Sequence, residues 1–164
     1  EKVSFIGRDY NMRVMLYCFE IEKVGVFMAS NVKVTWQNGS NFLVENETGG
    51  KADVGRGNIR AMEMILAALA SCSGVDVVNI LEKKRVNFSD LQIKVSGTRA
   101  ETHPMVYTDI HLTYLIWGEG IKEKDLETAI RLSEEKYCSV SAMLKSTVEI
   151  HSDYQILAPN EGAE

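Results

Sequence analysis

The sequence predicts an α+β fold, because its strand-like and helix-like segments come in blocks and do not alternate as repeated βαβ units. Three observations support this class: a hairpin signal followed by a long apolar helix, a pair of alternating strands, and a second helical stripe that precedes a final strand. The length of 164 residues suits one domain, and no Gly/Ser-rich linker or repeat divides the chain. We therefore expect one compact domain, preceded by a short extension.

The first elements are expected to be strands. Residues 1–31 form an N-terminal extension whose apolar runs, Val14–Phe19 and Val24–Ala29, resemble strands without a clean alternation between faces. The domain proper is expected to cover residues 32–164. Cys18 falls in the first apolar run, and we expect it to be a core residue, because free cysteines are among the most often buried side chains.

The domain is expected to open with a hairpin. Val32–Trp36 and Asn41–Glu45 are short apolar-rich runs on either side of Asn38-Gly39. An Asn-Gly pair between two such runs is the strongest short-range hairpin signal. We expect a third short strand near Lys51–Val54.

A long helix is expected to follow these strands. Asn58 is a good N-cap, and the cations of Lys83-Lys84-Arg85 suit a helix C-terminus. Apolar or small residues occupy nearly every side of the helix between them, so we expect it to be central and buried on most sides. The residues that mark its period are Ile59, Met62, Leu66, Leu69, Cys72, Asp76 and Ile80.

Two strands and a second helical stripe complete the pattern. Leu91–Arg99 and Val106–Trp117 have alternating character, and Thr147–Ile156 is expected to be the final strand. The stripe between them predicts that Tyr137 packs in the core. Its members are Leu126, Ile130, Ser133, Tyr137, Val140 and Leu144.

The stripe could also break into two helices, because residues 137–141 have weak helix propensity and Ser139 or Ser141 could cap a new helix. Cys138 would then precede a helix N-terminus, where backbone N–H groups and the helix dipole stabilise a thiolate. We therefore expect a lowered pKa for Cys138. Cys72 lies within the long helix among small residues, where a small apolar side chain packs without strain.

Composition and motifs exclude several classes of function. The net charge of -5 and the pI near 5.3 offer no field for phosphates, so we expect neither nucleic acid nor an anionic membrane as a partner. No apolar run approaches the roughly 20 residues of a membrane span, and we see no targeting segment. We therefore expect a cytoplasmic protein whose thiols are kept reduced. The histidines are scattered and no CxxC pair occurs, so we expect no metal.

Two motifs around the cysteines are specific. The run from Met62 to Val78, with Ala70-Ser71-Cys72-Ser73-Gly74 at its centre, resembles the central-helix signature of the OsmC/Ohr family of thiol-dependent peroxidases. The run from Leu132 to Val140, which contains Tyr137-Cys138-Ser139, is similar to the second-cysteine signature of that family in the form typical of its YhfA-like branch. The likeness extends from about residue 32 to residue 156.

The resemblance implies both a fold and a chemistry. The fold would be an OsmC-like intertwined homodimer, with antiparallel sheets packed around a central buried helix. In the implied cycle, Cys72 is the peroxidatic residue that attacks an organic hydroperoxide and becomes a sulfenic acid, and Cys138 is the resolving residue that forms a disulfide with it. The family needs no bound cofactor, and an external thiol or lipoyl-type dithiol would reduce the disulfide.

The resemblance also draws attention to charged residues near Cys72. The family assists its reactive cysteine with an Arg from the early strands and a Glu ten residues before the cysteine, where this chain has Met62. Glu63 is nine residues before Cys72, half a helical turn off and roughly 13.5 Å away along the axis, so it cannot touch Cys72 and is expected to favour the helix dipole. Arg60 is our first choice for an activating cation.

Asp76 follows Cys72 by four residues and shares its face of the helix. A carboxylate there disfavours a thiolate, and in so apolar a helix it needs a partner. The early strands, residues 32–54, contain no Arg, and the Glu is shifted by one position. These departures favour a second hypothesis: a non-enzymatic protein of the same fold that binds a small apolar ligand or acts in a stress response.

Overall fold

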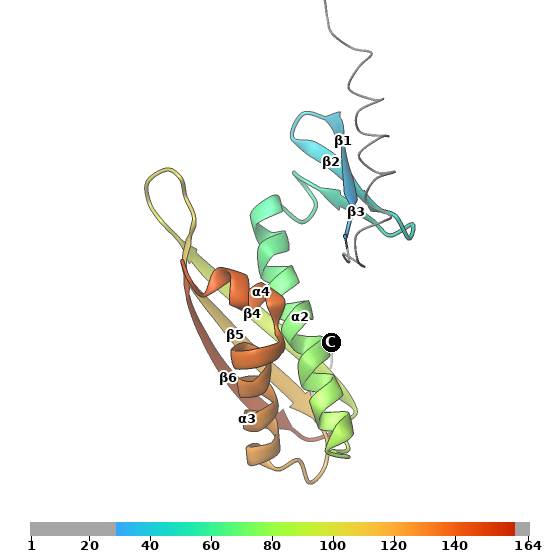
Figure 1. The fold of residues 1–164 in the computed structure, drawn as a ribbon, viewed down its shortest axis with the longest axis vertical. Coiled ribbons are helices and arrows are strands. Elements are labelled where there is room, and N and C mark those ends of the chain that lie inside the picture. Colours follow the sequence, from blue (N-terminus) through green and yellow to red (C-terminus); the bar gives the residue numbers. More distant parts are fainter. Residues whose placement is uncertain (1–28, 160–164) are drawn as a thin grey trace, which may run out of the picture.

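The computed structural model describes residues 29–159, which form two small sheets and a set of helices (Figure 1). Most of the expected N-terminal extension, including Cys18, lies outside the described residues, and residues 29–31 have no regular structure. The mixed α+β class is confirmed. In Figure 1 the first sheet lies near the top, and the helices cover one face of the second sheet below it.

The first sheet is the predicted hairpin with a third strand added. It is antiparallel in the order β1 (Val32–Asn38), β2 (Asn41–Asn46) and β3 (Lys51–Val54). Asn38 pairs with Asn41, and Gly39 between them has φ +49°, a conformation that glycine adopts at no steric cost. The apolar side chains of this hairpin are open to solvent in the single chain, since Trp36 is 63% exposed.

The long helix α2 spans Ala61–Lys83, and its predicted N-cap was wrong. The cap residue is Arg60, not Asn58. Ile59 forms an isolated parallel bridge with Val54, and its carbonyl accepts a hydrogen bond from the backbone N–H of Gly55. Because this pairing keeps Ile59 outside the helix, the first helical turn starts two residues later than expected. The predicted end at the basic cluster is confirmed.

The second sheet contains β4 (Asp90–Arg99), β5 (Tyr107–Trp117) and β6 (Glu149–Leu157) in that order. The expectation of antiparallel sheets holds for the β4–β5 pair but was wrong for β5 and β6, which are parallel. The chain leaves the end of β5, passes through the helical segments and crosses back to the end of the sheet where β5 begins, so that Glu149 lies beside Asp109. Such a crossover gives a parallel pair, whereas a tight turn gives an antiparallel one.

The helical stripe does break, and it does so through a π-helical turn. The segment consists of α3 (Glu123–Leu132), the π-helix η1 (Ser133–Tyr137) and α4 (Ser139–Leu144). The backbone N–H of Cys138 donates to the carbonyl of Ser133, five residues back. The wider turn shifts the phase of the stripe, and the prediction that Tyr137 packs in the core was wrong, because Tyr137 is 49% exposed.

The core lies between the second sheet and the helices. Its fully buried members come from one face of β5, from one face of α2 and from α3, and Tyr114 is the largest of them. Fifteen further apolar side chains pack against this cluster from its edges. The fully buried apolar residues include Leu69, Val77, Leu81, Ile110, Leu112, Tyr114, Ile116 and Leu126.

α2 buries only one face in the single chain. By length and composition alone it is the one described helix that could cross a membrane, whereas no membrane span was predicted from the sequence. Its buried Ser73 and half-buried Asp76 take part in hydrogen bonds with the sheet and with η1, as in the core helix of a globular domain. The opposite face is open, and Val75 on it is 61% exposed.

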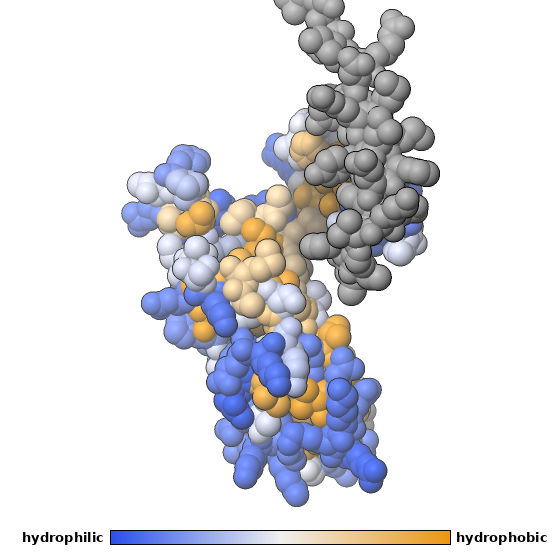
Figure 2. All heavy atoms as spheres, in the orientation of Figure 1, coloured by the Kyte–Doolittle hydropathy of each residue, from blue (hydrophilic) through white to orange (hydrophobic). Residues whose placement is uncertain are grey.

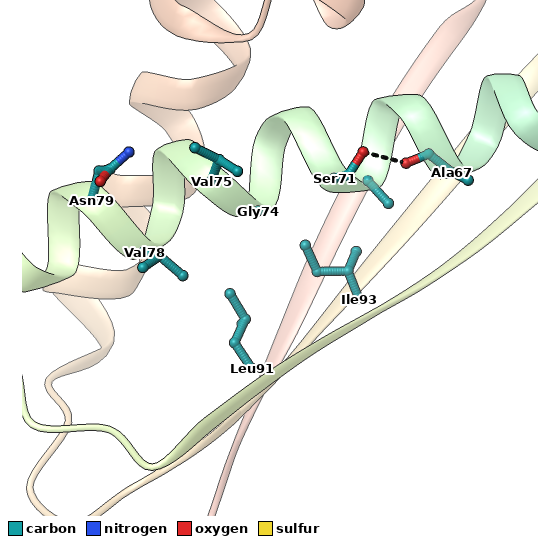
Figure 3. A pocket seen from close by; sticks show the side chains of 9 residues that line it. Ala67, Ser71, Gly74, Val75, Val78, Asn79, Leu91 and Ile93 are labelled. Carbon is teal, nitrogen blue, oxygen red and sulfur yellow. Dashed lines mark hydrogen bonds between the residues drawn. The ribbon is translucent and has the colours of Figure 1, made fainter. Parts of the chain in front are cut away.

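Figure 2 shows apolar side chains along the middle of one face of the molecule, with polar side chains on either side of its lower part. An apolar pocket of about 600 Å³ lies beside the open face of α2 (Figure 3). β4 supplies its floor, where Leu91 and Ile93 face the helix. The remaining lining residues are Ala67, Ala70, Ser71, Gly74, Val75, Val78 and Asn79.

Candidate redox site

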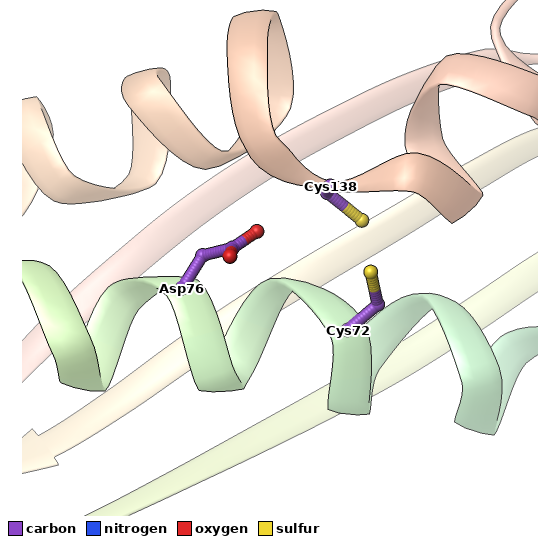
Figure 4. Close-up of side chains that lie close together, drawn as sticks. All are labelled: Cys72, Asp76 and Cys138. Atoms are coloured by element: carbon purple, nitrogen blue, oxygen red, sulfur yellow. The ribbon is translucent and has the colours of Figure 1, made fainter. Parts of the chain in front are cut away.

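The fold brings the two predicted redox cysteines together. Cys72 lies midway along α2, and Cys138 lies between η1 and α4, 66 positions later in the sequence. Their sulfur atoms point toward each other across the gap between these segments (Figure 4). The two Sγ atoms and a carboxylate oxygen of Asp76 all lie within 4.8 Å of one another. Both cysteines are free thiols in this structure.

Cys138 itself is the N-cap of α4, where Ser139 or Ser141 was expected. Its Sγ accepts a hydrogen bond from the backbone N–H of Ser141 at 3.3 Å. The wide π turn before it places the side chain in the core, where it is only 2% exposed. The sequence could indicate a helix start here, but it could not show that the sulfur would be the capping atom.

The predicted lowering of the Cys138 pKa was wrong. Burial raises the pKa of the Cys138 thiol from 9.0 to about 11. The backbone N–H of Ser141 opposes this rise, and the hydrogen bond and charge of Cys72 add to it. Desolvation therefore outweighs the helix N-terminus, and Cys138 is held as a neutral thiol at pH 7.

Asp76 has the partner that its position demanded. Ser133 donates its hydroxyl to Asp76 Oδ2 at 3.0 Å. The oxygen of Ser133 lies 2.9 Å from that of Ser73, which in turn lies 2.6 Å from the Tyr114 hydroxyl. Tyr114 is fully buried, and desolvation raises its pKa to about 12, so it remains protonated.

Sequence reasoning missed three members of this network: Ser73, Tyr114 and Ser133. Ser133 carried a signal, because a serine on an otherwise apolar helical stripe must hydrogen bond once it is buried. Tyr114 carried a similar one, since a buried tyrosine usually has a partner for its hydroxyl. Nothing in the pattern could show that all three would meet at Asp76.

Arg60 and Glu63 lie away from the thiols. They form the start of α2, where the backbone N–H of Arg60 donates to Glu63 at 2.8 Å and the two side chains make an ion pair at 2.6 Å. This confirms that Glu63 serves the helix start. Cys72 is twelve residues beyond Arg60, a rise of roughly 18 Å along the helix, so the structure does not bring Arg60 to the thiol.

Tyr137 is next to Cys138 in sequence but faces outward. Its ring lies beneath the Lys136 ammonium, which is 5.3 Å from the ring centre. It takes no part in the hydrogen bonds described for the thiol pair.

Two groups of side chains in the described part of the chain could supply donor atoms to a metal ion. One is the group of Cys72, Asp76 and Cys138. The other is largely exposed and already joined by ion pairs, and it consists of Asp109, Glu149 and His151.

Comparison with known proteins agrees with the motifs. The family described as OsmC-like protein matches residues 54–153, which include both cysteines and the whole network around them. The chain belongs to the OsmC-like family. It is 37% identical over 130 residues to Protein YhfA of Escherichia coli K12, an alignment that covers 77% of this chain and 97% of that protein. The YhfA-like branch of the family is thus supported.

Solved structures with OsmC-like folds resemble the chain over most of its length. A hypothetical protein from Aquifex aeolicus VF5 is 36% identical, with a TM-score of 0.75 over 80% of this chain and 98% of that one. A Legionella pneumophila protein described as an organic hydroperoxide resistance protein OsmC, predicted redox protein, has a TM-score of 0.62 over 80% and 99%. At 16% identity, the latter likeness speaks for the fold alone.

Proposed function

We propose that this OsmC-like protein is a thiol-dependent peroxidase that reduces organic hydroperoxides, with Cys72 peroxidatic and Cys138 resolving. The observation that carries the proposal is the approach of the two sulfur atoms to within 4.8 Å. A disulfide needs them about 2.05 Å apart, a change that modest movement of the η1–α4 junction can supply. An OsmC-like relative whose name refers to hydroperoxide resistance adds support at the level of the fold.

The exposure of the two thiols supports their different roles. Cys72 is only partly buried, so an oxidant from solvent can reach it, whereas Cys138 is 2% exposed and held as a neutral thiol. The thiolate is the nucleophile, and Cys138 is held as a neutral thiol away from solvent. We therefore expect the more accessible Cys72 to react first. A buried thiol beside it is protected from solvent oxidants and positioned to attack the sulfenic acid.

The proposed cycle has three steps. The Cys72 thiolate attacks the hydroperoxide, the O–O bond breaks, and the alkoxide takes a proton to leave as the alcohol, with Cys72 now a sulfenic acid. Cys138 then attacks the Cys72 sulfur, and water leaves as the disulfide forms. An external dithiol, of the thiol or lipoyl type, reduces the disulfide and returns both residues to thiols. No bound cofactor is needed.

Substitution of each thiol tests the proposal. In a stopped-flow assay with cumene hydroperoxide and excess dithiol, we expect Cys72→Ser to abolish turnover. Cys138→Ser should still consume one equivalent of hydroperoxide and accumulate a sulfenic acid that a dimedone-type reagent traps. Cys18→Ser serves as the matched control and should leave turnover unchanged. Unaltered turnover in Cys72→Ser would end the proposal.

We also propose that the protein acts as a homodimer. The open apolar face of α2 and the exposed apolar side chains of the first sheet would be buried by a second copy, as is typical of OsmC-like proteins. Those surfaces lie on different parts of the chain, which suits an intertwined arrangement. A helix that is apolar nearly all round is stable in water only when most of its faces are covered.

The apolar pocket beside α2 favours a second candidate function. A volume of about 600 Å³ is in the range of small-molecule sites, and the lining is mostly aliphatic. In this alternative the protein binds a small apolar ligand and the cysteines take no part. A ligand-binding protein would show no Cys72-dependent consumption of hydroperoxide even in the parent, so the peroxidase assay separates the two candidates.

A further inference from the structure

We propose that the reduced site binds a zinc-like divalent cation, with Cys72, Cys138 and Asp76 as its three protein ligands. The site would then exist in two exclusive states, a metal-bound dithiolate and a disulfide. A bound metal would block turnover, an expectation that rests on the proposed peroxidase function. Metal binding itself does not depend on that function.

The donor atoms suit such an ion in type and spacing. Two sulfurs and one carboxylate oxygen with a remaining position for water match the composition of open zinc sites. Zn–S bonds of about 2.3 Å in a tetrahedron place two sulfurs about 3.8 Å apart. The three donor atoms lie within 4.8 Å of one another. Closing around an ion therefore requires the two sulfurs to approach by at most about 1 Å and each sulfur–oxygen pair by at most about 1.3 Å.

The hydrogen-bond network behind Asp76 has the direction expected of an outer ligand shell. Ser133 gives its only proton to Asp76, so it must accept from Ser73, which must accept from the Tyr114 hydroxyl. Three hydroxyls thus donate in sequence toward one carboxylate and fix its orientation. Carboxylates that bind metals are held by outer partners in this way.

The negative charge of the site is hard to explain by peroxidase chemistry alone. The Asp76 carboxylate lies within 4.8 Å of both sulfurs, although the proposed cycle gives it no role. Glu134 adds to the negative potential felt at Tyr114, and its Oε1 is buried without a hydrogen-bond partner in the described part of the chain. A bound cation would offset this negative charge, because it interacts favourably with two thiolates and the Asp76 carboxylate together.

The binding step is balanced without any redox change. Both thiols release their protons to solvent, the two thiolates and the Asp76 carboxylate bind the cation, and no electron moves. The metal occupies the lone pairs that would attack a hydroperoxide or a sulfenic acid. No metal was predicted from the sequence because the histidines are scattered and no CxxC pair occurs, but here the two sulfurs come from separate segments of the chain.

Cobalt serves as the spectroscopic probe of the reduced full-length protein in a Cys18→Ser background. We expect Co²⁺ to bind with a stoichiometry of one per chain, to show a thiolate-to-metal charge-transfer band, and to be displaced by Zn²⁺. Asp76→Asn keeps the size of the side chain and an acceptor for Ser133, and it should weaken binding by about tenfold or more. Glu82→Gln, on the exposed face of the same helix, is the matched control and should bind as the parent does.

A second measurement does not depend on the variants folding. Stoichiometric Zn²⁺ should slow the reaction of both thiols of the parent protein with an aryl disulfide reagent, and a chelator should restore the rate. Absence of the charge-transfer band, or equal affinity in parent and Asp76→Asn, would overturn the proposal. If the band appears but the protein never consumes hydroperoxide, the metal site stands and the peroxidase function fails.

Discussion

At the scale of single residues, Cys138 has two structural roles. It caps α4 through its sulfur and it faces Cys72 across the gap between helices. A serine or aspartate would cap the helix better, because oxygen is the stronger hydrogen-bond acceptor. The cysteine at this cap is therefore better explained by its chemistry than by the stability of the helix.

The raised pKa of Cys138 predicts how stability depends on pH. The folded chain keeps this proton up to about pH 11, whereas a thiol with the ordinary pKa of 9.0 loses it earlier. The stabilisation is therefore complete below pH 9 and is lost as the pH rises toward 11. We expect the difference in unfolding free energy between the reduced parent and Cys138→Ala to shrink over that range, as measured by urea denaturation.

Tyr114 has a raised pKa as well, and its contribution is lost in the same direction at still higher pH. It is present in both proteins, and its main cause, desolvation, cancels in the comparison, whereas the smaller part that comes from the charge of Cys138 is lost with that residue. The lost cap and the lost packing of Cys138→Ala give an offset that does not vary with pH. A difference that stays constant from pH 8 to pH 11 would contradict the raised pKa of the Cys138 thiol.

At the scale of elements, the start of α2 depends on one reciprocal contact. The Glu63 carboxylate accepts from the backbone N–H of Arg60 and pairs with its guanidinium, and the backbone hydrogen bond is the main reason that the pKa of Glu63 is lowered. We expect Glu63→Gln to lower the urea midpoint and to leave hydroperoxide turnover unchanged, because Cys72 is roughly 13.5 Å further along the helix. Lost turnover in a folded Glu63→Gln protein would instead place Glu63 in the chemistry.

The sequence predicted most elements correctly, and its errors have local physical causes. Periodicity located the hairpin, α2 and the strands of the second sheet, since each pattern reports which side chains face the core. The cap at Asn58 failed because the bridge of Ile59 to Val54 competes for the same residues. Tyr137 failed because a π turn adds one residue to the stripe, a change that leaves no mark in the spacing.

The candidate site was only partly predictable for a related reason. Two long motifs pointed to Cys72 and Cys138, and the geometry brings them together. The pKa of Cys138 was predicted in the wrong direction, because the helix N-terminus can be read from the sequence and the depth of burial cannot. Ser73, Tyr114 and Ser133 come from three elements, and only the tertiary fold shows that they meet.

At the scale of the whole molecule, the described part of the chain does not bury all of its apolar surface. The second sheet and its helices bury a continuous cluster, but α2 has an open apolar face and the first sheet leaves Trp36 largely exposed. Open apolar surface of this kind marks a binding surface. The same open face borders the pocket of Figure 3, so the proposed dimer would also limit access to that pocket.

A single charge on this face tests the proposed homodimer. Val75 is 61% exposed and lines the apolar pocket, so a second copy of the chain would bury it. We expect Val75→Asp to shift the protein from dimer to monomer in sedimentation equilibrium, because an unpaired carboxylate in an apolar interface costs several kcal/mol, on the order of 3 to 5. Lys124→Gln changes the net charge by the same amount on the exposed surface of α3 and should remain dimeric. A parent protein that sediments as a monomer, or a Val75→Asp variant that remains a dimer, would show that this face is not covered by a second copy.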